Sequence, residues 1–210
     1  MIETYLTSGL LAYLLGSVPT AVWVGKAFYG VDVRNEGSKN AGATNTFRVL
    51  GKKPGIIVLV IDILKGVIAV LLPLFIFSLQ SDSLLYGNIK VLCGIMAVVG
   101  HIFPVFAGFN GGKGVATSLG VVIGISPPAA AICITLFLIV FIASQFVSLG
   151  AIIASIAFPL TIIFVLKEDN QILIVFSVVL AIAVILAHRK NITRLLAGNE
   201  NKMNLFKKKS

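Results

Sequence analysis

The amino-acid sequence predicts an all-α integral membrane protein that crosses the membrane seven times. Hydrophobic residues make up 58% of the 210 residues and charged residues only 12%, whereas an ordinary soluble domain is about 25% charged. Residues 114–166 contain no acidic, basic or histidine side chain. This composition argues against a soluble globule, a disordered chain and a disulfide-rich scaffold, and it leaves a chain whose solvent is the bilayer.

Apolar runs long enough to cross the hydrocarbon, which takes roughly 20 residues, recur along the whole chain. The uncharged stretch is long enough for more than two crossings, and Ser126-Pro127-Pro128 and the polar residues 144–150 divide it. The runs outside that stretch cover residues 5–28, 54–79, 86–109 and 170–187.

The distribution of basic residues predicts the orientation, because Lys and Arg accumulate in cytoplasmic loops. Residues 25–53 and the tail from residue 188 onward hold 13 of the 17 Lys and Arg, so both should be cytoplasmic and the N-terminus outside. That arrangement requires an odd number of crossings. Val115–Ser126 spans only about 18 Å as a helix, and counting it as a short, tilted or broken fourth span gives seven.

The chain shows no internal repeat and no linker, which predicts one membrane domain over residues 1–198 and a basic cytoplasmic tail over 199–210. The first apolar run lacks a basic n-region and a clear cleavage site, so we interpret it as a retained span. Cys93 and Cys133 lie inside apolar runs and are interpreted as small hydrophobic residues.

The polar stretch Gly37–Arg48 concentrates glycines, hydroxyls, amides and two cations in twelve positions. Glycine lets backbone N–H groups approach an anion, and successive N–H groups form an anion-binding nest. Arg48 can bind a phosphate through two hydrogen bonds. A polar loop built from ordinary turn residues is the alternative interpretation.

A second glycine-rich stretch, Gly108–Gly114, precedes an apolar run and contains Lys113. It lacks the Walker pattern, because Ala107 and Gly114 stand where that motif needs glycine and a hydroxyl. A glycine turn that opens a helix still favours an anion through its free amides and the helix dipole. The alternative is a flexible loop whose lysine reaches the membrane surface.

A few isolated polar residues are also candidates. Asp62 and Lys65 lie three apart inside the second span, where an ion pair between them is the structural interpretation. His101, in the third span, is interpreted as a buried, hydrogen-bonded histidine. His188 at the start of the tail could donate to an anion or act as a base. Ser148, placed in a short connection, has no visible partners for a nucleophilic triad.

Six motifs occur in one order along the chain, and together they resemble the bacterial acyl-phosphate–glycerol-3-phosphate acyltransferase family, PlsY. The likeness runs from about Leu10 to Gly198, and Lys39 departs from it, because the family often has glycine there. The motifs are Gly16–Pro19, Gly37–Asn45, His101–Pro104, Gly111–Thr117, Ser148–Gly150 and His188–Ile192.

The resemblance implies a seven-helix enzyme that moves a fatty acyl group from acyl phosphate to the 1-hydroxyl of sn-glycerol 3-phosphate. The products are lysophosphatidic acid and phosphate, in the first step of phospholipid synthesis, and neither acyl-CoA nor acyl carrier protein is the direct donor. No metal or cofactor, no nucleic acid and no obligatory protein partner is implied. The expected location is the bacterial inner membrane, with the active site at the cytoplasmic face.

The resemblance also implies the site residues. Ser38, Asn40, Gly42 and Asn45 would cradle the acyl phosphate, and the proton of the attacking hydroxyl would go to the donor's own phosphate, with His188 as the rival base. The residues implied to be catalytic are Ser38, Arg48, Lys113, Ser148 and His188. The residues implied to bind substrate are Gly37, Asn40, Gly42, Thr44, Asn45, Gly111, Gly112, Gly114 and Asn191. Those expected to hold glycerol 3-phosphate are Arg48, Lys113, Ser148, His188 and Asn191.

Two other classes of function remain open from the residues alone. A transporter for a phosphorylated solute would use a broken helix and intramembrane charges such as Asp62 and Lys65. Against it, the polar motifs gather at one predicted face of the membrane. A non-catalytic scaffold whose basic tail binds anionic lipid is the other, and it leaves both glycine-rich stretches without a role.

Overall fold

The computed structural model describes residues 1–77 and 83–203, and within these ranges every regular element is a helix. The chain divides into two compact units, Met1–Pro127 and Pro128–Ser210. Leu79, the expected end of the second span, and Lys207, Lys208 and Lys209 of the basic tail lie outside the described residues.

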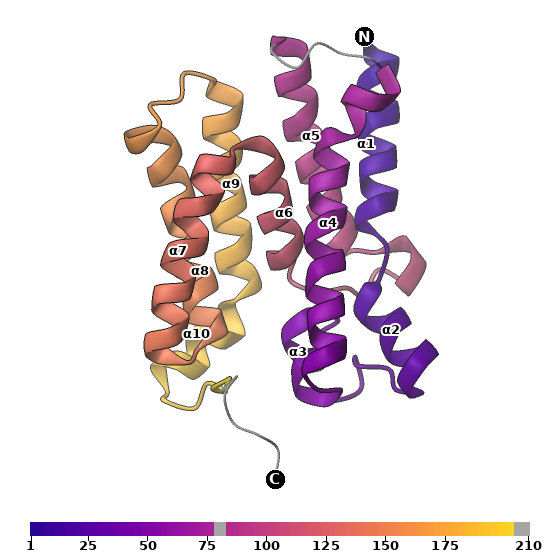
Figure 1. Ribbon diagram of the computed structural model, residues 1–210, viewed down its shortest axis with the longest axis vertical. Helices are drawn as coiled ribbons and strands as arrows, with labels where there is room; N and C mark the ends of the chain where they lie inside the picture. Colours follow the sequence, from indigo (N-terminus) through magenta and orange to yellow (C-terminus); the bar gives the residue numbers. More distant parts are fainter. Residues whose placement is uncertain (78–82, 204–210) are drawn as a thin grey trace. The chain divides into compact units, whose positions relative to one another are not determined.

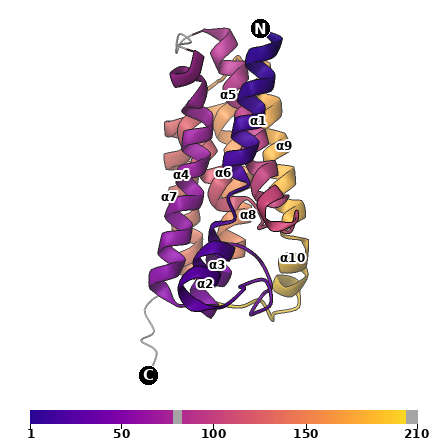
Figure 2. The ribbon, with the colours of Figure 1, turned by 90° about the vertical axis from the view of Figure 1, so that its right-hand side faces the viewer.

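The first unit is a helical bundle with short helices and loops at the end opposite the N-terminus (Figures 1 and 2). Helices α1 and α4 run in opposite directions, so α4 begins at the end of the bundle where α1 finishes. Helices α2 and α3 lie at this same end, near the beginning of α4. Its elements are α1 (Ile2–Gly16), α2 (Thr20–Tyr29), α3 (Ala43–Val49), α4 (Lys52–Phe77), α5 (Leu84–Ile102), the 3-10 turn η1 (Val105–Ala107) and α6 (Val115–Ile125).

The expected first span is interrupted. Helix α1 ends at Gly16 and α2 begins at Thr20, with Pro19 between them. Proline has no N–H to continue a helical hydrogen-bond ladder, so carbonyl groups near the break need other donors. Residues Ile2–Tyr29 together remain long and apolar enough to cross a membrane.

Small residues let the helices of the first unit approach closely, as they do in membrane bundles generally. A Cβ on Gly66 of α4 would collide with the carbonyl oxygen of Thr117 on α6, and one on Gly120 would collide with that of Ile63. The glycines therefore fix the contact between α4 and α6 at backbone distance. This contact holds the beginning of α6 against the middle of α4.

The predicted helix after the second glycine stretch is confirmed as α6, an 11-residue helix. At 1.5 Å per residue it is roughly 16 Å long, which is shorter than the hydrocarbon core of a bilayer. Counting it as a crossing stays a prediction.

The interpretation of Asp62 and Lys65 as an ion pair is confirmed. Lys65 Nζ lies 2.8 Å from Asp62 Oδ1, and both side chains are at most 4% exposed. Lys65 also donates to the carbonyl of Val18 at 2.9 Å, and Thr20 donates to Asp62 Oδ1 at 3.0 Å. The pair on α4 therefore supplies hydrogen-bond partners for the Val18 carbonyl and the Thr20 hydroxyl, which lie at the break between α1 and α2.

In its described residues the second unit consists of three long apolar helices and one short amphipathic helix, which Figure 1 labels α7 to α10. Pro127 and Pro128 begin α7, as the sequence punctuation predicted, since proline is tolerated in a first helical turn. The elements are α7 (Pro127–Ser144), α8 (Val147–Leu160) with a π turn η2 (Thr161–Val165), α9 (Gln171–Ala187) and α10 (Arg189–Leu196).

The connection between α7 and α8 is shorter than predicted. Only Gln145 and Phe146 separate the two helices, and Gln145 adopts a positive φ of 63° to make the turn. The prediction that Ser148 lies in the connection between the helices is wrong. It lies in the first turn of α8 and is buried.

The described residues contain five helices or helix pairs long and apolar enough to cross a membrane, and a sixth if α9 and α10, bent by 60°, count as one span. The chain is therefore an integral membrane protein that crosses the membrane several times, and in its described residues it is all-helical. The number seven and the orientation of the termini stay predictions. The spans found by length and composition are Ile2–Tyr29, Lys52–Phe77, Leu84–Ala107, Pro127–Ser144 and Val147–Val165.

Replacing Lys65 with methionine should destabilise the folded protein by about 3–5 kcal/mol, because it leaves the Asp62 carboxylate buried without its cation. Thermal unfolding in detergent measures this through a thiol-reactive dye, since Cys93 and Cys133 are both buried in the folded protein.

The double variant Asp62→Asn/Lys65→Met is the matched control, because the introduced asparagine is uncharged and can still accept the hydrogen bond from Thr20. It should be more stable than Lys65→Met alone. A single variant as stable as the wild type would contradict a structural role for the pair.

Candidate functional site

The loop before α3 is organised by the buried side chain of Asn45. Its Oδ1 accepts hydrogen bonds from the backbone N–H and the hydroxyl of Ser38, at 2.8 and 3.0 Å. Its Nδ2 donates to the carbonyls of Val33 at 2.7 Å and Glu36 at 3.1 Å. These four bonds use the full donor capacity of the amide and both of its acceptor sites. Asn45 therefore shapes the loop that presents Ser38.

Ser38 lies between two residues with left-handed backbone, Gly37 at φ 57° and Lys39 at φ 59°. Left-handed backbone suits glycine, and a lysine there is strained. This explains in physical terms why the resembling family often has glycine at position 39. The turn leaves Ser38 exposed at the surface of the first unit.

The other predicted residues of this stretch lie between the turn at Ser38 and the end of α3. Asn40 is half-buried, and its Oδ1 lies close to Gly42, which adopts an extended backbone before α3. Thr44 lies in the first turn of α3 and Arg48 in the last, both half-buried. Gly42 and Arg48 therefore lie at opposite ends of the seven-residue helix α3.

The second glycine stretch folds back on the end of α5. The amides of Gly111 and Gly112 donate to the carbonyls of Ile102 and His101, at 3.2 and 3.1 Å. These two amides are therefore engaged within the protein. Gly114, at φ 80°, caps α6, and half-buried Lys113 comes just before it. The first amides of α6 lack acceptors within the helix, so the prediction of a glycine turn opening a helix is confirmed.

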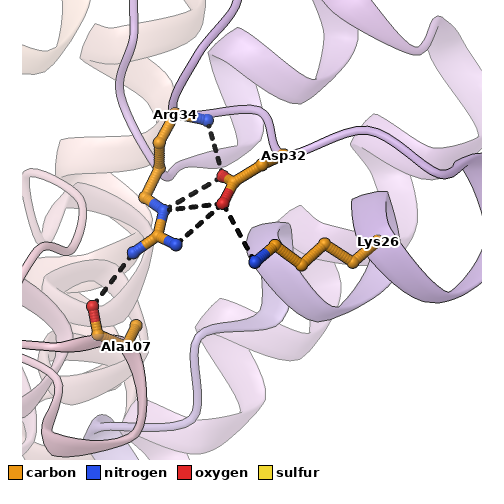
Figure 3. A network of polar contacts seen from close by, with 4 residues as sticks. All are labelled: Lys26, Asp32, Arg34 and Ala107. Atoms are coloured by element: carbon orange, nitrogen blue, oxygen red, sulfur yellow. Dashed lines mark hydrogen bonds and ion pairs between the residues drawn. The ribbon is translucent and has the colours of Figure 1, made fainter.

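The two glycine stretches meet inside the first unit. A Cβ built on Gly112 would lie 3.0 Å from the carbonyl oxygen of Ala41 and would collide with the ring of His101. Only glycine fits this gap without displacing a neighbour. The guanidinium of Arg34 adds a second link by donating to the carbonyl of Ala107 at 2.9 Å (Figure 3).

Gly112 also borders a buried polar cluster that consists of Asp62 and Lys65 on α4 and His101 on α5. The ring of His101 is buried, and its Nδ1 lies 3.1 Å from Thr117 Oγ1 on α6 and 3.8 Å from Asp62 Oδ1. The interpretation of His101 as a buried, hydrogen-bonded histidine is confirmed. A cavity of about 10 Å³, enough for roughly one water molecule, is lined by residues that include Thr20, Ala41, Asp62, Lys65, His101, Gly111 and Gly112.

In the second unit, Glu200 joins two of the predicted site residues. Its Oε1 accepts hydrogen bonds from the hydroxyl of Ser148 at 2.9 Å and from Nδ2 of Asn191 at 2.7 Å. Its Oε2 accepts from Nε of Arg194 at 2.6 Å. Ser148, Asn191 and Glu200 are all buried. The first turn of α8, helix α10 and the chain after it are therefore held by one carboxylate.

His188 stands at the bend between α9 and α10 and is buried. Its Nδ1 lies 2.8 Å from the carbonyl oxygen of Val184. A carbonyl oxygen can only accept, so this bond requires hydrogen on Nδ1. In the neutral ring Nε2 then carries the lone pair. The ring is held in the tautomer that a base acting through Nε2 requires.

Sequence reasoning missed Glu200 and Arg34. Glu200 is the only acidic residue between positions 170 and 210, and a lone acid in a basic segment is a signal of a specific ion pair. Arg34 follows Asp32 at a spacing of two, which allows a local pair. Neither signal identifies Ser148 and Asn191 as the donors to Glu200, or the carbonyl of Ala107 as the acceptor for Arg34.

Glu200 should make stability depend on pH. Burial raises the pKa of its carboxyl, but the hydrogen bonds from Arg194, Asn191 and Ser148 outweigh burial and lower the pKa below its ordinary value of 4.5. A lowered pKa in the folded state contributes stability that is present above pH 4.5 and is lost as the pH falls through the folded value.

Glu200→Gln should therefore destabilise the protein by about 1–2 kcal/mol at pH 7, since bonds to a charged group are worth more than neutral ones and Arg194 is screened by solvent. The difference from the wild type should shrink as the pH falls below about 4.5. Thermal unfolding at several pH values measures both. A difference that stays constant across this range would show that the Glu200 charge has no role.

Lys39→Gly should stabilise the protein by about 0.5–1 kcal/mol. The left-handed backbone costs a non-glycine residue about 1–2 kcal/mol, and the greater freedom of glycine in the unfolded chain offsets part of that gain. The same unfolding assay tests this, with Glu36→Gly as control, because Glu36 is not among the residues with positive φ. The control should lower the unfolding midpoint, and a lower midpoint for Lys39→Gly would contradict the assigned strain.

The comparisons with known proteins agree on one family. The family model for glycerol-3-phosphate acyltransferase matches residues 6–198. A glycerol-3-phosphate acyltransferase of Fusobacterium nucleatum subsp. nucleatum is 46% identical over 193 residues, covering 92% of this chain and 95% of that protein. One from Chlorobaculum tepidum is 40% identical and covers 98% of this chain and 99% of that protein.

Two solved structures have the same fold. The glycerol 3-phosphate form of PlsY (YgiH), an integral membrane glycerol 3-phosphate acyltransferase, has a TM-score of 0.85 at 40% identity and covers 97% of this chain and 99% of its own. The lysophosphatidic acid form has a TM-score of 0.81 at 39% identity, covering 95% of both chains. With matches of this extent in sequence and fold, the chain belongs to the glycerol-3-phosphate acyltransferase family.

Proposed function

We propose that this chain transfers a fatty acyl group from acyl phosphate to the 1-hydroxyl of sn-glycerol 3-phosphate, giving lysophosphatidic acid and phosphate. Membership of the family supports acyl transfer to glycerol 3-phosphate, and the two related structures are a glycerol 3-phosphate form and a lysophosphatidic acid form. The observation that carries the proposal is the contact of two glycine-rich loops, at Gly112 and Ala41, in the first unit. Both substrates carry phosphate, which such loops suit.

The first loop is proposed to hold the acyl phosphate. Asn45 accepts from both the backbone N–H and the hydroxyl of exposed Ser38, so the turn around Ser38 is held in one geometry. Preorganised donors stabilise developing charge without reorganising during the reaction. The residues assigned to this cradle are Gly37, Ser38, Asn40, Gly42, Thr44 and Asn45, with Asn45 acting by shaping the loop.

Cationic and polar side chains are proposed to bind glycerol 3-phosphate. In the first unit, Arg48 and Lys113 supply positive charge, and the glycines at 111, 112 and 114 set the turn that carries Lys113. In the second unit, Ser148 and Asn191 share the Glu200 carboxylate, and His188 is fixed by its Nδ1 hydrogen bond. These three are proposed to bind glycerol 3-phosphate.

The chemistry asks mainly for positioning and charge stabilisation. The 1-hydroxyl oxygen attacks the acyl carbonyl carbon and forms the ester bond. The bond from that carbon to the bridging oxygen breaks, and its electron pair leaves with the phosphate. The hydroxyl proton is proposed to pass to the departing phosphate, and Nε2 of His188 is the alternative acceptor. Because acyl phosphate is already activated, this proposal includes no metal or cofactor.

The same proposal sets the protein in its membrane. Seven spans with α6 as the short fourth, an outside N-terminus and a cytoplasmic C-terminus would place the two glycine-rich loops at the cytoplasmic face. The location is then the bacterial inner membrane. Residues 1–198 act as one catalytic domain and residues 199–210 as a basic tail, with the lipid bilayer as partner and no obligatory protein or nucleic acid.

Phosphate release by the purified protein from palmitoyl phosphate, with and without glycerol 3-phosphate, tests the donor. The proposal expects release that depends on glycerol 3-phosphate, with an equal amount of lysophosphatidic acid. Palmitoyl-CoA and palmitoyl-acyl carrier protein are the matched alternative donors. Turnover with palmitoyl-CoA but not with palmitoyl phosphate would leave the acceptor standing and show the donor to be wrong.

Lys113→Ala should raise the KM for glycerol 3-phosphate by roughly 10–100-fold, because a charge-assisted hydrogen bond is worth about 1.5–3 kcal/mol. The KM for acyl phosphate should change much less. Steady-state kinetics with each substrate varied in turn measures the difference, and Lys53→Ala, at an exposed position on α4, serves as control. Wild-type kinetics for Lys113→Ala would contradict the assignment.

A further inference from the structure

Arg34 connects the two loops by a side chain that neither glycine motif contains. Its Nε lies 3.0 Å from Asp32 Oδ1 and its Nη2 lies 2.7 Å from Asp32 Oδ2, which is a two-point pairing of guanidinium and carboxylate. Its remaining nitrogen, Nη1, donates to the carbonyl of Ala107 at 2.9 Å. Figure 3 shows the guanidinium held between the carboxylate on one side and this carbonyl on the other.

Asp32 is itself fixed, so the guanidinium has little freedom to turn. Its Oδ1 also accepts from the backbone N–H of Arg34 at 3.0 Å, and its Oδ2 lies 3.2 Å from Nζ of Lys26. The side chains of Asp32 and Arg34 are only 14% and 20% exposed, whereas that of Lys26 is 56% exposed. The hydrogen bond from Arg34 lowers the pKa of Asp32, so the pair stays charged at neutral pH.

Each end of this contact is tied to one of the loops. The carbonyls of Val33 and Glu36, on either side of Arg34 in the chain, accept from Asn45, which also fixes Ser38. Ala107 ends η1 and is followed by left-handed residues Gly108 and Phe109, at φ 61° and 59°. The chain then runs on to Lys113. A planar, two-point donor such as Arg34 sets distance and angle together, which a lysine cannot do.

We propose that Arg34 is a positioning residue that sets the spacing between the loop carrying Ser38 and the loop 108–114 carrying Lys113. It thereby places Lys113 where it can bind glycerol 3-phosphate. This inference rests on the proposed role of Lys113. Arg34 touches neither substrate in this scheme and acts through the backbone at Ala107. Its loss leaves Lys113 present but poorly placed.

Arg34→Gln, Arg34→Lys and Lys26→Gln, measured with each substrate varied in turn, test the proposal. Arg34→Gln should raise the KM for glycerol 3-phosphate at least tenfold, with the KM for acyl phosphate within threefold of wild type. Arg34→Lys keeps the charge and should recover only part of the loss. Lys26→Gln removes a contact to Asp32 without touching Ala107, and both KM values should stay within twofold.

Two further readouts separate positioning from general destabilisation. In Arg34→Gln, hydrogen exchange in the folded protein should become at least tenfold faster at the amides of Gly111 and Gly112, with exchange in α4 unchanged. In a Lys113→Ala background, Arg34→Gln should add less than twofold to the KM for glycerol 3-phosphate, because the group it places is gone.

Equal increases in both KM values, full multiplication of the two effects in the double variant, or unchanged exchange at Gly111 and Gly112 would each overturn the proposal. If Arg34→Gln does not fold, Arg34→Lys carries the same comparisons with smaller expected changes. If Lys113→Ala leaves the KM for glycerol 3-phosphate unchanged, the proposed role of Lys113 fails, and the exchange measurement alone then decides whether Arg34 orders the loop.

Discussion

The ion pair between Asp62 and Lys65 inside α4 is the constraint on which the first unit depends. Two charges in a membrane-spanning helix are costly unless both are satisfied, and here the surrounding chain supplies the partners. Val18 and Thr20 contribute a carbonyl and a hydroxyl from the break between α1 and α2, and His101 lies within 3.8 Å of the same carboxylate. One buried ion pair therefore satisfies the polar groups at the helix break and lies beside the histidine on α5.

The second glycine-rich stretch is built directly on that cluster. Gly112 fits only because it has no Cβ beside His101 and Ala41, and its amide is bonded to the His101 carbonyl. The loop before α3 is fixed separately, by the Asn45 amide. A rigid buried layer thus supports an end of the unit where glycines, hydroxyls and cations are exposed or half-buried. Preorganisation of this kind suits a reaction whose activated donor needs positioning more than chemical activation.

The sequence was sufficient for the class of fold, because hydropathy and uncharged length report directly on the bilayer as solvent. It also placed the Lys113 turn before a helix and paired Asp62 with Lys65, since both depend on local spacing. It missed the interruption at Pro19, the first-turn position of Ser148 and the role of Glu200. The role of Glu200 depends on contacts between residues apart in the chain, such as that with Ser148, and periodicity carries no information about such contacts.

The central claim is that the first glycine-rich loop, around Ser38, binds the phosphate of the acyl donor. Hydrogen exchange of the purified protein with a non-transferable acyl phosphonate, in place of acyl phosphate, tests it most directly. Slower exchange is predicted in residues 37–46, where Asn45 holds the turn around Ser38. Competitive inhibition by the phosphonate with respect to acyl phosphate, with no change of exchange in residues 37–46, would contradict the claim.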